Sequence, residues 1–270
     1  MHDASTSPIF WHLDDIDWTP VQRQRNADGS ESVVREKWPI IRLGFLSAHV
    51  FYEPGMVVRR HGHRSNHIVF VLGGDGWIGS EPVGPGMHIH VPLGAAFGPI
   101  VAGPAGLICW ELSFGEFGGW GDQPELYERE IAARGVSPLP DPPLEIGDWF
   151  VDPRGDWGAE RSSPKVDGMR EVLLPLDSLA WEPIGDDGAR MRKPIDTPEF
   201  SSTWIECPAD VTIERTDTAF RLYWIDRGSV SIDGRHCPAG THIEVPAGVT
   251  LGRFSAGPEG FALLELVDRP

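Results

Sequence analysis

Cysteine is scarce in this sequence, and the few residues present are widely spaced. Cys109, Cys207 and Cys237 are the three cysteines, and no Cys-x-x-Cys pair occurs. An odd number of distant cysteines excludes a disulfide framework and a structural zinc knuckle. The sequence also lacks an apolar run long enough to span a bilayer and an N-terminal basic segment followed by an apolar stretch. We therefore expect a cytoplasmic protein with no membrane partner.

Basic residues are also few. The chain carries 23 Lys and Arg against 40 Asp and Glu, which gives a formal net charge of −17 over 270 residues. A surface of this sign repels the phosphates of nucleic acids and of anionic lipids. Nucleic acid is therefore excluded as a partner, and a small-molecule substrate is expected instead.

Several familiar catalytic arrangements are missing. No Ser-His-Asp, Cys-His or paired-carboxylate arrangement stands out at a readable spacing. The glycine-rich turn at residues 73–76 lacks the strand-to-helix context of a phosphate-binding loop. Any reaction would then have to depend on a bound metal.

Glycine and proline are abundant, with 32 and 25 residues, and 40% of the chain is hydrophobic. This composition fits many short strands joined by tight turns better than it fits long helices. The length allows one large domain or two of ordinary size. The sequence therefore predicts an all-β fold with a substantial core.

Three histidines lie within seven residues, and they are the strongest sign of chemistry in the chain. His61 and His63 are two apart, so they share one face of an extended segment. Residues 64–66 are polar and predict a turn, after which His67 begins a new strand that ends in the glycines of residues 73–76. Three neutral imidazoles converging from two adjacent strands would suit a divalent transition metal with open positions for substrate.

This stretch resembles the first signature of the cupin superfamily, which reads Gly, five residues, His-x-His, three or four residues, Glu, six residues, Gly. Gly55, His61, His63 and Gly74 match it in register, while His67 stands at the Glu position. The resemblance implies a small antiparallel double-stranded β-helix, or jelly-roll barrel, with a metal in its mouth. The implied ligand set is His61, His63 and His67.

The second cupin signature is also present over residues 86–97, except at its last position. It reads Gly, five residues, Pro-x-Gly, two residues, His, and the chain follows it through Gly86, Pro92 and Gly94. Phe97 then replaces the fourth ligand of the family. The resemblance therefore implies an altered site with three histidines.

An internal repeat covers much of the chain. Shifted by 154 positions, residues 86–112 align with residues 240–266 without a gap and with 13 identities, which include Glu111 on Glu265. Such a match indicates duplication, and the chain resembles a two-barrel cupin, or bicupin. We predict barrels at residues 10–114 and 171–270, joined by a linker over residues 115–170.

The repeat distinguishes residues kept for folding from residues kept for chemistry. The equivalents of His61, His63 and His67 are Arg215, Asp217 and Arg221, so the second barrel is expected to bind no metal and to serve packing, dimerisation or walling of the site. The resemblance to cupins, together with the need to cover open sheet edges, implies a homodimer through barrel edge strands.

Two further histidines, in the second signature, are judged by the same comparison. His88 aligns with His242 in the half that lacks the other histidines, which favours a structural, hydrogen-bonding role for His88. His90 aligns with Glu244, and its role stays open between structure and substrate binding.

The linker contains one predicted helix, over residues 122–135. Asp122 is its expected N-terminal cap, Pro124 lies in its first turn and Gly135 ends it. Trp149, Phe150 and Trp157 follow a proline-rich connector. They are expected to pin the linker to the outside of a barrel, with a lid over the metal site as the alternative.

The resemblance to cupins with three-histidine iron centres implies a dioxygenase that cleaves a C–C bond in a small diketone, hydroxyketone or phenolic substrate. Fe(II) is the favoured metal, with Zn, Mn and Ni as alternatives. The alternative functions are a redox-neutral metal-dependent isomerase, lyase or hydrolase, or a non-catalytic small-molecule binder. The expected walls of the substrate pocket are Val69, Val71, Trp77, His90 and Phe97.

Overall fold

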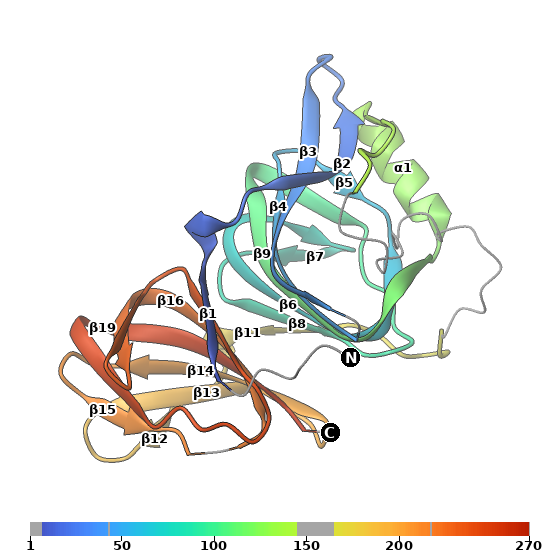
Figure 1. The fold of residues 1–270 in the computed structure, drawn as a ribbon. Helices are drawn as coiled ribbons and strands as arrows, with labels where there is room; N and C mark the ends of the chain where they lie inside the picture. Colours follow the sequence, from blue (N-terminus) through green and yellow to red (C-terminus); the bar gives the residue numbers. More distant parts are fainter. Residues whose placement is uncertain (1–6, 43, 145–164, 217, 270) are drawn as a thin grey trace. The chain divides into compact units, whose positions relative to one another are not determined.

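The computed structural model describes residues 7–42, 44–144, 165–216 and 218–269, and the chain divides there into two compact units (Figure 1). The N-terminal unit comprises Asp17–Pro175, and the C-terminal unit comprises Leu176–Pro270 together with the N-terminal segment that ends at Ile16. Strands dominate both units, which bears out the predicted β fold. No helix in the described part of the chain is long and apolar enough to cross a membrane.

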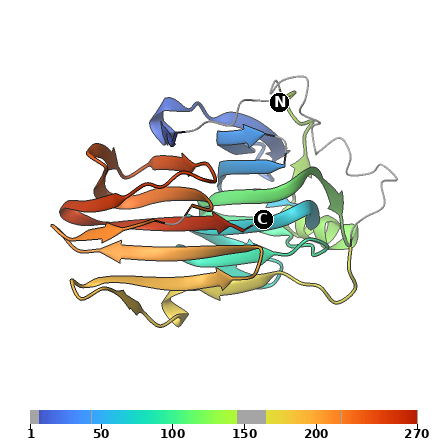
Figure 2. The ribbon, with the colours of Figure 1, turned by 60° about the horizontal axis from the view of Figure 1, so that its bottom comes forward.

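The N-terminal unit contains one 10-stranded sheet in the order β10-β2-β3-β4-β9-β6-β8-β11, with β5 paired to β9 and β7 paired to β6. Its strands run antiparallel and curve around the core (Figure 2). The strands are β2 (Thr19–Arg25), β3 (Glu31–Arg42), β4 (Phe45–Tyr52), β5 (Val57–Val58), β6 (His61–Ile78), β7 (Glu81–Val83), β8 (Met87–Val91), β9 (Ile100–Gly121), β10 (Ser137–Pro138) and β11 (Val172–Pro175).

The C-terminal unit contains one 9-stranded sheet in the order β1-β18-β16-β19-β14-β13-β12, with β15 paired to β19 and β17 paired to β16. Short 3-10 helices lie at Leu13–Asp15 and Leu176–Ser178. The strands are β1 (Ile9–His12), β12 (Glu182–Ile184), β13 (Ala189–Asp196), β14 (Phe200–Cys207), β15 (Thr212–Glu214), β16 (Phe220–Ile232), β17 (Arg235–Pro238), β18 (Thr241–Val245) and β19 (Arg253–Asp268).

The pairing of the strands reproduces the sequence repeat. The order β4-β9-β6-β8 in one sheet corresponds to β14-β19-β16-β18 in the other. The residue pairs correspond as well, since Val69 faces Glu111 in the first sheet and Tyr223 faces Glu265 in the second, at the same shift of 154. The predicted duplication is thus visible in the backbone.

The two units exchange one edge strand each. β1, from the start of the chain, pairs with β18 among the strands of the C-terminal unit, and β11, which follows the linker, pairs with β8 in the N-terminal unit (Figure 1). The hydrogen bond from Leu13 N to Gly240 O, at 3.0 Å, also ties the first segment down. The observed units differ from the predicted division at 10–114, 115–170 and 171–270 in these two strands, and the described part of the predicted linker belongs to the N-terminal unit.

Each unit has its own apolar core on the inner face of its sheet. Val69, Val71 and Ile89 belong to the first core, and Ile225, Ile243 and Leu263 belong to the second. Cross-strand pairs such as Val69 with Ile89 place apolar side chains on the same face. The cores hold β6 and β16 in place, and β6 carries the histidines.

The linker helix α1 (Pro124–Arg134) ends as predicted but begins differently. Gly135 has φ 65° and closes the helix through bonds from its N–H to Ala132 O and Ile131 O. The N-terminal cap is Gln123, not Asp122, whose carboxylate is instead 3.1 Å from Arg60 Nε and also binds Lys165. The aromatic residues Trp149, Phe150 and Trp157 lie outside the described residues.

Candidate metal centre

The three predicted ligands lie on β6, which is one continuous strand from His61 to Ile78. The predicted turn at residues 64–66 is wrong, because β9 runs beside β6 on both sides of it. The pairing of β6 with β9 continues through this region with a shift in register between His63, which pairs with Gly119, and Ser65, which pairs with Gly115. A bulge within one strand therefore lies where the sequence predicts a turn between two strands.

The structure brings His61, His63 and His67 together. The ring centroids of His61 and His63 are 4.9 Å apart, and those of His63 and His67 are 4.4 Å apart. All three are buried or half-buried. The sequence therefore identified a true cluster of imidazoles.

Phe97 closes one side of this cluster. It is fully buried and forms an isolated antiparallel bridge with His61. Its ring centroid lies 4.6 Å from that of His61, 5.3 Å from that of His67 and 6.1 Å from that of His63. Phe97, which stands at the fourth ligand position of the cupin pattern, therefore lies beside all three histidines.

Burial favours the neutral form of the imidazoles. Desolvation lowers the pKa of His61 to about 4, despite the opposing contact with the carbonyl of Arg59. Desolvation and the neighbouring histidines hold the pKa of His63 well below its usual range. Neutral imidazole is the form that binds a metal, so these rings are in the right protonation state at neutral pH.

The hydrogen bonds of the rings differ. His61 Nδ1 lies 2.8 Å from the carbonyl oxygen of Arg59. Among the described residues, His63 Nε2 and His67 Nδ1 are buried and have no hydrogen-bond partner. A buried polar atom without a partner is costly, so these two nitrogens are suited to bind a ligand.

Glu111 is a residue of this site that the sequence reasoning missed. It lies on β9, where its Oε2 is 3.2 Å from His67 Nε2 and its Oε1 accepts a hydrogen bond of 2.6 Å from the Tyr52 hydroxyl. Burial raises the pKa of Glu111, but the contacts with His67 and Tyr52 outweigh it and leave that pKa below its usual range. The identity with Glu265 in the repeat was the available signal, although identity between the halves by itself favours a role in folding.

The equivalent place in the C-terminal unit contains fixed cations. Arg215 forms an ion pair with Glu265, and its Nε is 3.0 Å from Glu265 Oε1. Arg221 is fully buried and donates to the Tyr223 hydroxyl at 3.3 Å, which in turn donates to Glu265 at 2.8 Å. Asp217 lies outside the described residues. Guanidinium groups therefore stand where the first unit has His61 and His67.

Two predicted pocket residues are not part of the cluster. Trp77 is 40% exposed, because two register shifts between Val71 and Gly76 change the face that follows. His90 pairs with Ile68, on the face opposite Val69 and Ile89, so it points away from the core. Val69, Val71 and Phe97 do lie in the core cluster on the side of His67.

His88 is a buried residue in ring contact, while its predicted hydrogen-bonding role stays a prediction. Its ring packs against Phe70 at 5.2 Å, and the equivalent His242 packs against Trp224 at 4.8 Å. Burial lowers the pKa of both residues to about 3. Both histidines are neutral packing residues on the face opposite the core.

The donor atoms of the cluster are close but do not converge on one point. Within the described ranges, no three His, Cys, Asp or Glu side chains form a ready-made metal site. The donor set does fit a metal, since two buried ring nitrogens lack partners and a carboxylate lies beside them. Binding an ion through all three rings would require side-chain rotation.

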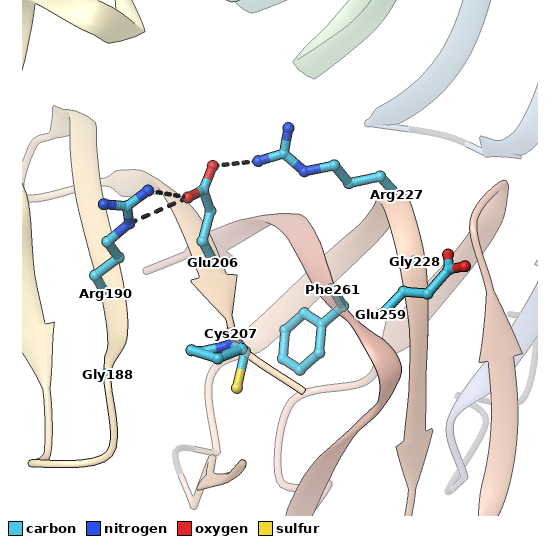
Figure 3. A pocket seen from close by; sticks show the side chains of 9 residues that line it. Gly188, Arg190, Glu206, Cys207, Arg227, Gly228, Glu259 and Phe261 are labelled. Atoms are coloured by element: carbon cyan, nitrogen blue, oxygen red, sulfur yellow. Dashed lines mark hydrogen bonds and ion pairs between the residues drawn. The ribbon is translucent and has the colours of Figure 1, made fainter. Parts of the chain in front are cut away.

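A cavity of about 520 Å³ lies elsewhere, in the C-terminal unit. Figure 3 shows Arg190 and Arg227 reaching Glu206 from two sides. Cys207 and Phe261 form part of its wall. It contains none of the predicted site residues.

No protein-family model matches the chain, and no curated protein does. Among solved structures, the chain is similar to a Nostoc punctiforme protein described as a "putative dioxygenase", at 12% identity and a TM-score of 0.68, over 97% of this chain and 83% of that one. It is also similar to oxalate decarboxylase from Bacillus subtilis, at 15% identity and a TM-score of 0.60, over 98% of this chain and 77% of that one.

A further structure of the Bacillus subtilis decarboxylase, which concerns its Mn(II) centres, matches with a TM-score of 0.59 and 15% identity over 98% of this chain and 78% of that one. Identities this low show the shared fold alone. The chain therefore has, over nearly its whole length, the fold of these structures.

Proposed function

We propose that the protein is a metal-dependent enzyme whose ion is held by His61, His63 and His67. The observation that carries this proposal is the cluster of three imidazoles, of which His61 and His67 are buried and His63 is half-buried; within the described part of the chain, His63 Nε2 and His67 Nδ1 have no hydrogen-bond partner. Imidazole donors in an enclosed, mainly apolar site are typical ligands of Fe, Zn, Mn and Ni.

Each ring offers one nitrogen to the ion. His61 would bind through Nε2, because its Nδ1 lies against the carbonyl of Arg59. His63 would use Nε2 and His67 would use Nδ1, since these are the nitrogens without a hydrogen-bond partner. Phe97, on the remaining side, supplies no donor and leaves coordination positions open to other molecules.

Iron(II) is the ion we favour, and oxidative cleavage of a C–C bond is the reaction. When bound, iron(II) would bring dioxygen and a substrate with two adjacent oxygens into one coordination sphere. The side chains of Val69, Val71 and Phe97 would exclude water and suit a small diketone, hydroxyketone or phenolic compound. The similarity to the Nostoc punctiforme protein supports this choice.

A redox-neutral reaction is the second candidate. The similarity to oxalate decarboxylase, and the Mn(II) centres of that enzyme, support a lyase with manganese as this alternative. The buried Glu111 also adds a carboxylate, which is a ligand type that manganese accepts well.

Elemental analysis of the protein purified without added metal, together with oxygen uptake in the presence of diketones and phenols, tests these proposals. Iron with oxygen uptake supports the dioxygenase. Manganese or zinc without oxygen uptake supports the redox-neutral enzyme. Absence of bound metal, and no binding of added Fe(II), Mn(II) or Zn(II), would contradict both and leave a small-molecule binder.

A further inference from the structure

Glu111 contacts the imidazole cluster from a neighbouring strand. It faces Val69 of β6 and Ala48 of β4 across the sheet, with Cys109 of the core two residues before it. Its two oxygens have different partners: Oε1 accepts from the Tyr52 hydroxyl at 2.6 Å, and Oε2 lies 3.2 Å from His67 Nε2. A buried carboxylate held in this way fixes whatever ring it touches.

We propose that Glu111, held by Tyr52, is a positioning residue that keeps the proton of His67 on Nε2 and so presents Nδ1 to the metal. This inference rests on the metal site proposed above. The two nitrogens of His67 match the assignment, since Nε2 faces the carboxylate and Nδ1 is buried with no hydrogen-bond partner among the residues that the structure describes. A carboxylate on the far nitrogen of a ligating histidine also increases the basicity of the near one.

The repeat supplies an independent argument. Glu265 is the equivalent of Glu111, and it too accepts from a tyrosine hydroxyl, that of Tyr223, at 2.8 Å. The two tyrosines come from different strands, because Tyr52 lies on β4 and Tyr223 lies on β16. In each unit a tyrosine hydroxyl donates to the carboxylate, although the tyrosine comes from a different strand. This indicates that the carboxylate needs a fixed orientation in both units.

The side chain that the carboxylate contacts differs between the two units. Glu265 pairs with the guanidinium of Arg215, which carries a permanent charge and fills its site. Glu111 faces His67, an imidazole with a second nitrogen still to be used. The same device therefore anchors an internal cation in one unit and prepares a metal ligand in the other.

Two measurements test this inference. The first uses metal-free protein labelled with ¹⁵N in histidine, in which NMR identifies the protonated ring nitrogen of His67, assigned by the signals lost in His67→Gln. We expect the proton on Nε2. A proton on Nδ1 would overturn the inference whether or not the protein binds metal, so this result is separate from failure of the proposed function.

The second measurement is a Co(II) titration followed by visible absorption. Glu111→Gln should weaken Co(II) binding by about 10- to 100-fold, and Tyr52→Phe should weaken it less and in the same direction. Glu265→Gln is the matched control, because it removes the equivalent buried charge away from the site, and it should leave Co(II) affinity unchanged. Equal affinity in Glu111→Gln and the parent protein, or equal losses in Glu111→Gln and Glu265→Gln, would contradict the role.

Discussion

Phe97 and His61 form an antiparallel bridge in which the N–H of each residue donates to the carbonyl of the other, at 2.8 Å and 3.0 Å. Residues paired directly across a bridge project to the same side, and here the two rings lie 4.6 Å apart. Any side chain at position 97 is therefore presented to the imidazole cluster. The identity of this residue should decide how many coordination positions stay open.

Replacing Phe97 with histidine should add a fourth imidazole. We expect Phe97→His to tighten metal binding and to suppress activity, because the new ring occupies a position that substrate or dioxygen needs. Metal affinity and turnover should be measured on the same preparation. Phe97→Leu is the control, since it keeps the position apolar and should retain the metal. Weaker metal binding in Phe97→His than in Phe97→Leu would contradict this arrangement.

The roles assigned to the histidines separate in alanine variants. His61→Ala, His63→Ala and His67→Ala should each lose bound metal and activity, since one of three ligands is removed. His88→Ala should keep the metal but lower the free energy of unfolding by about 2 kcal/mol or more, because the ring is buried against Phe70. Metal content and urea denaturation distinguish the two classes. Full metal content in His67→Ala would show that the ligand set is wrong.

Acid sensitivity should follow from the buried His242. Its pKa falls from 6.5 to about 3 on folding because of burial. Between these values the unfolded chain binds a proton that the folded protein excludes, so stability falls as the pH falls below 6.5; above 6.5 both states are neutral and this contribution disappears. From pH 6.5 to 5 the loss is about 2 kcal/mol.

The measurement is urea denaturation at pH 7 and pH 5. In His242→Gln the difference in the free energy of unfolding between pH 7 and pH 5 should be smaller by about 2 kcal/mol. This holds even if the substitution lowers the free energy of unfolding at pH 7. The exposed His236 provides the control, and His236→Gln should leave the difference unchanged. An equal pH dependence in the parent protein and His242→Gln would refute the assignment.

Two glycines related by the repeat cannot accept a side chain. Gly74 has φ 74°, and a Cβ there would lie 2.0 Å from Gly106 O; Gly228 has φ 70°, with a Cβ 2.1 Å from Gly260 O. Gly228→Ala should therefore lower the free energy of unfolding by about 3 kcal/mol or more, because backbone strain and atomic overlap act together. Gly234 has φ 86° and open space around it. Gly234→Ala is therefore the control, and it should lower the free energy of unfolding by only about 1 kcal/mol. Thermal unfolding of the two variants compares them directly.

The sequence carried enough information for the β architecture, its duplication and the imidazole cluster, because these depend on local spacing and on the repeat. Alternation along a strand placed His67, Val69 and Val71 on one face, as observed. Alternation failed at Trp77, since the bulges that change its face arise from pairing with β9. Bulges depend on two strands at once and leave little trace in one of them.

Glu111 shows a different limit of sequence reading. Its spacing from the histidines is more than forty residues, and only the pairing of β6 with β9 brings it to His67. The repeat did mark Glu111 through its identity with Glu265. A residue common to both halves can still serve chemistry in one of them, because its neighbours differ: His67 in the first unit and Arg215 in the second.

The exchange of β1 and β11 makes the C-terminal unit a product of two separate pieces of chain. Four residue pairs join β1 to β18, and His12 Nε2 lies 3.0 Å from Ala239 O. A gene fragment that begins at Leu176 would leave the edge of β18 bare and prone to pair with another molecule. Adding a synthetic peptide of residues 7–16 should increase the solubility of such a fragment, because a ligand that binds only the folded state stabilises that state.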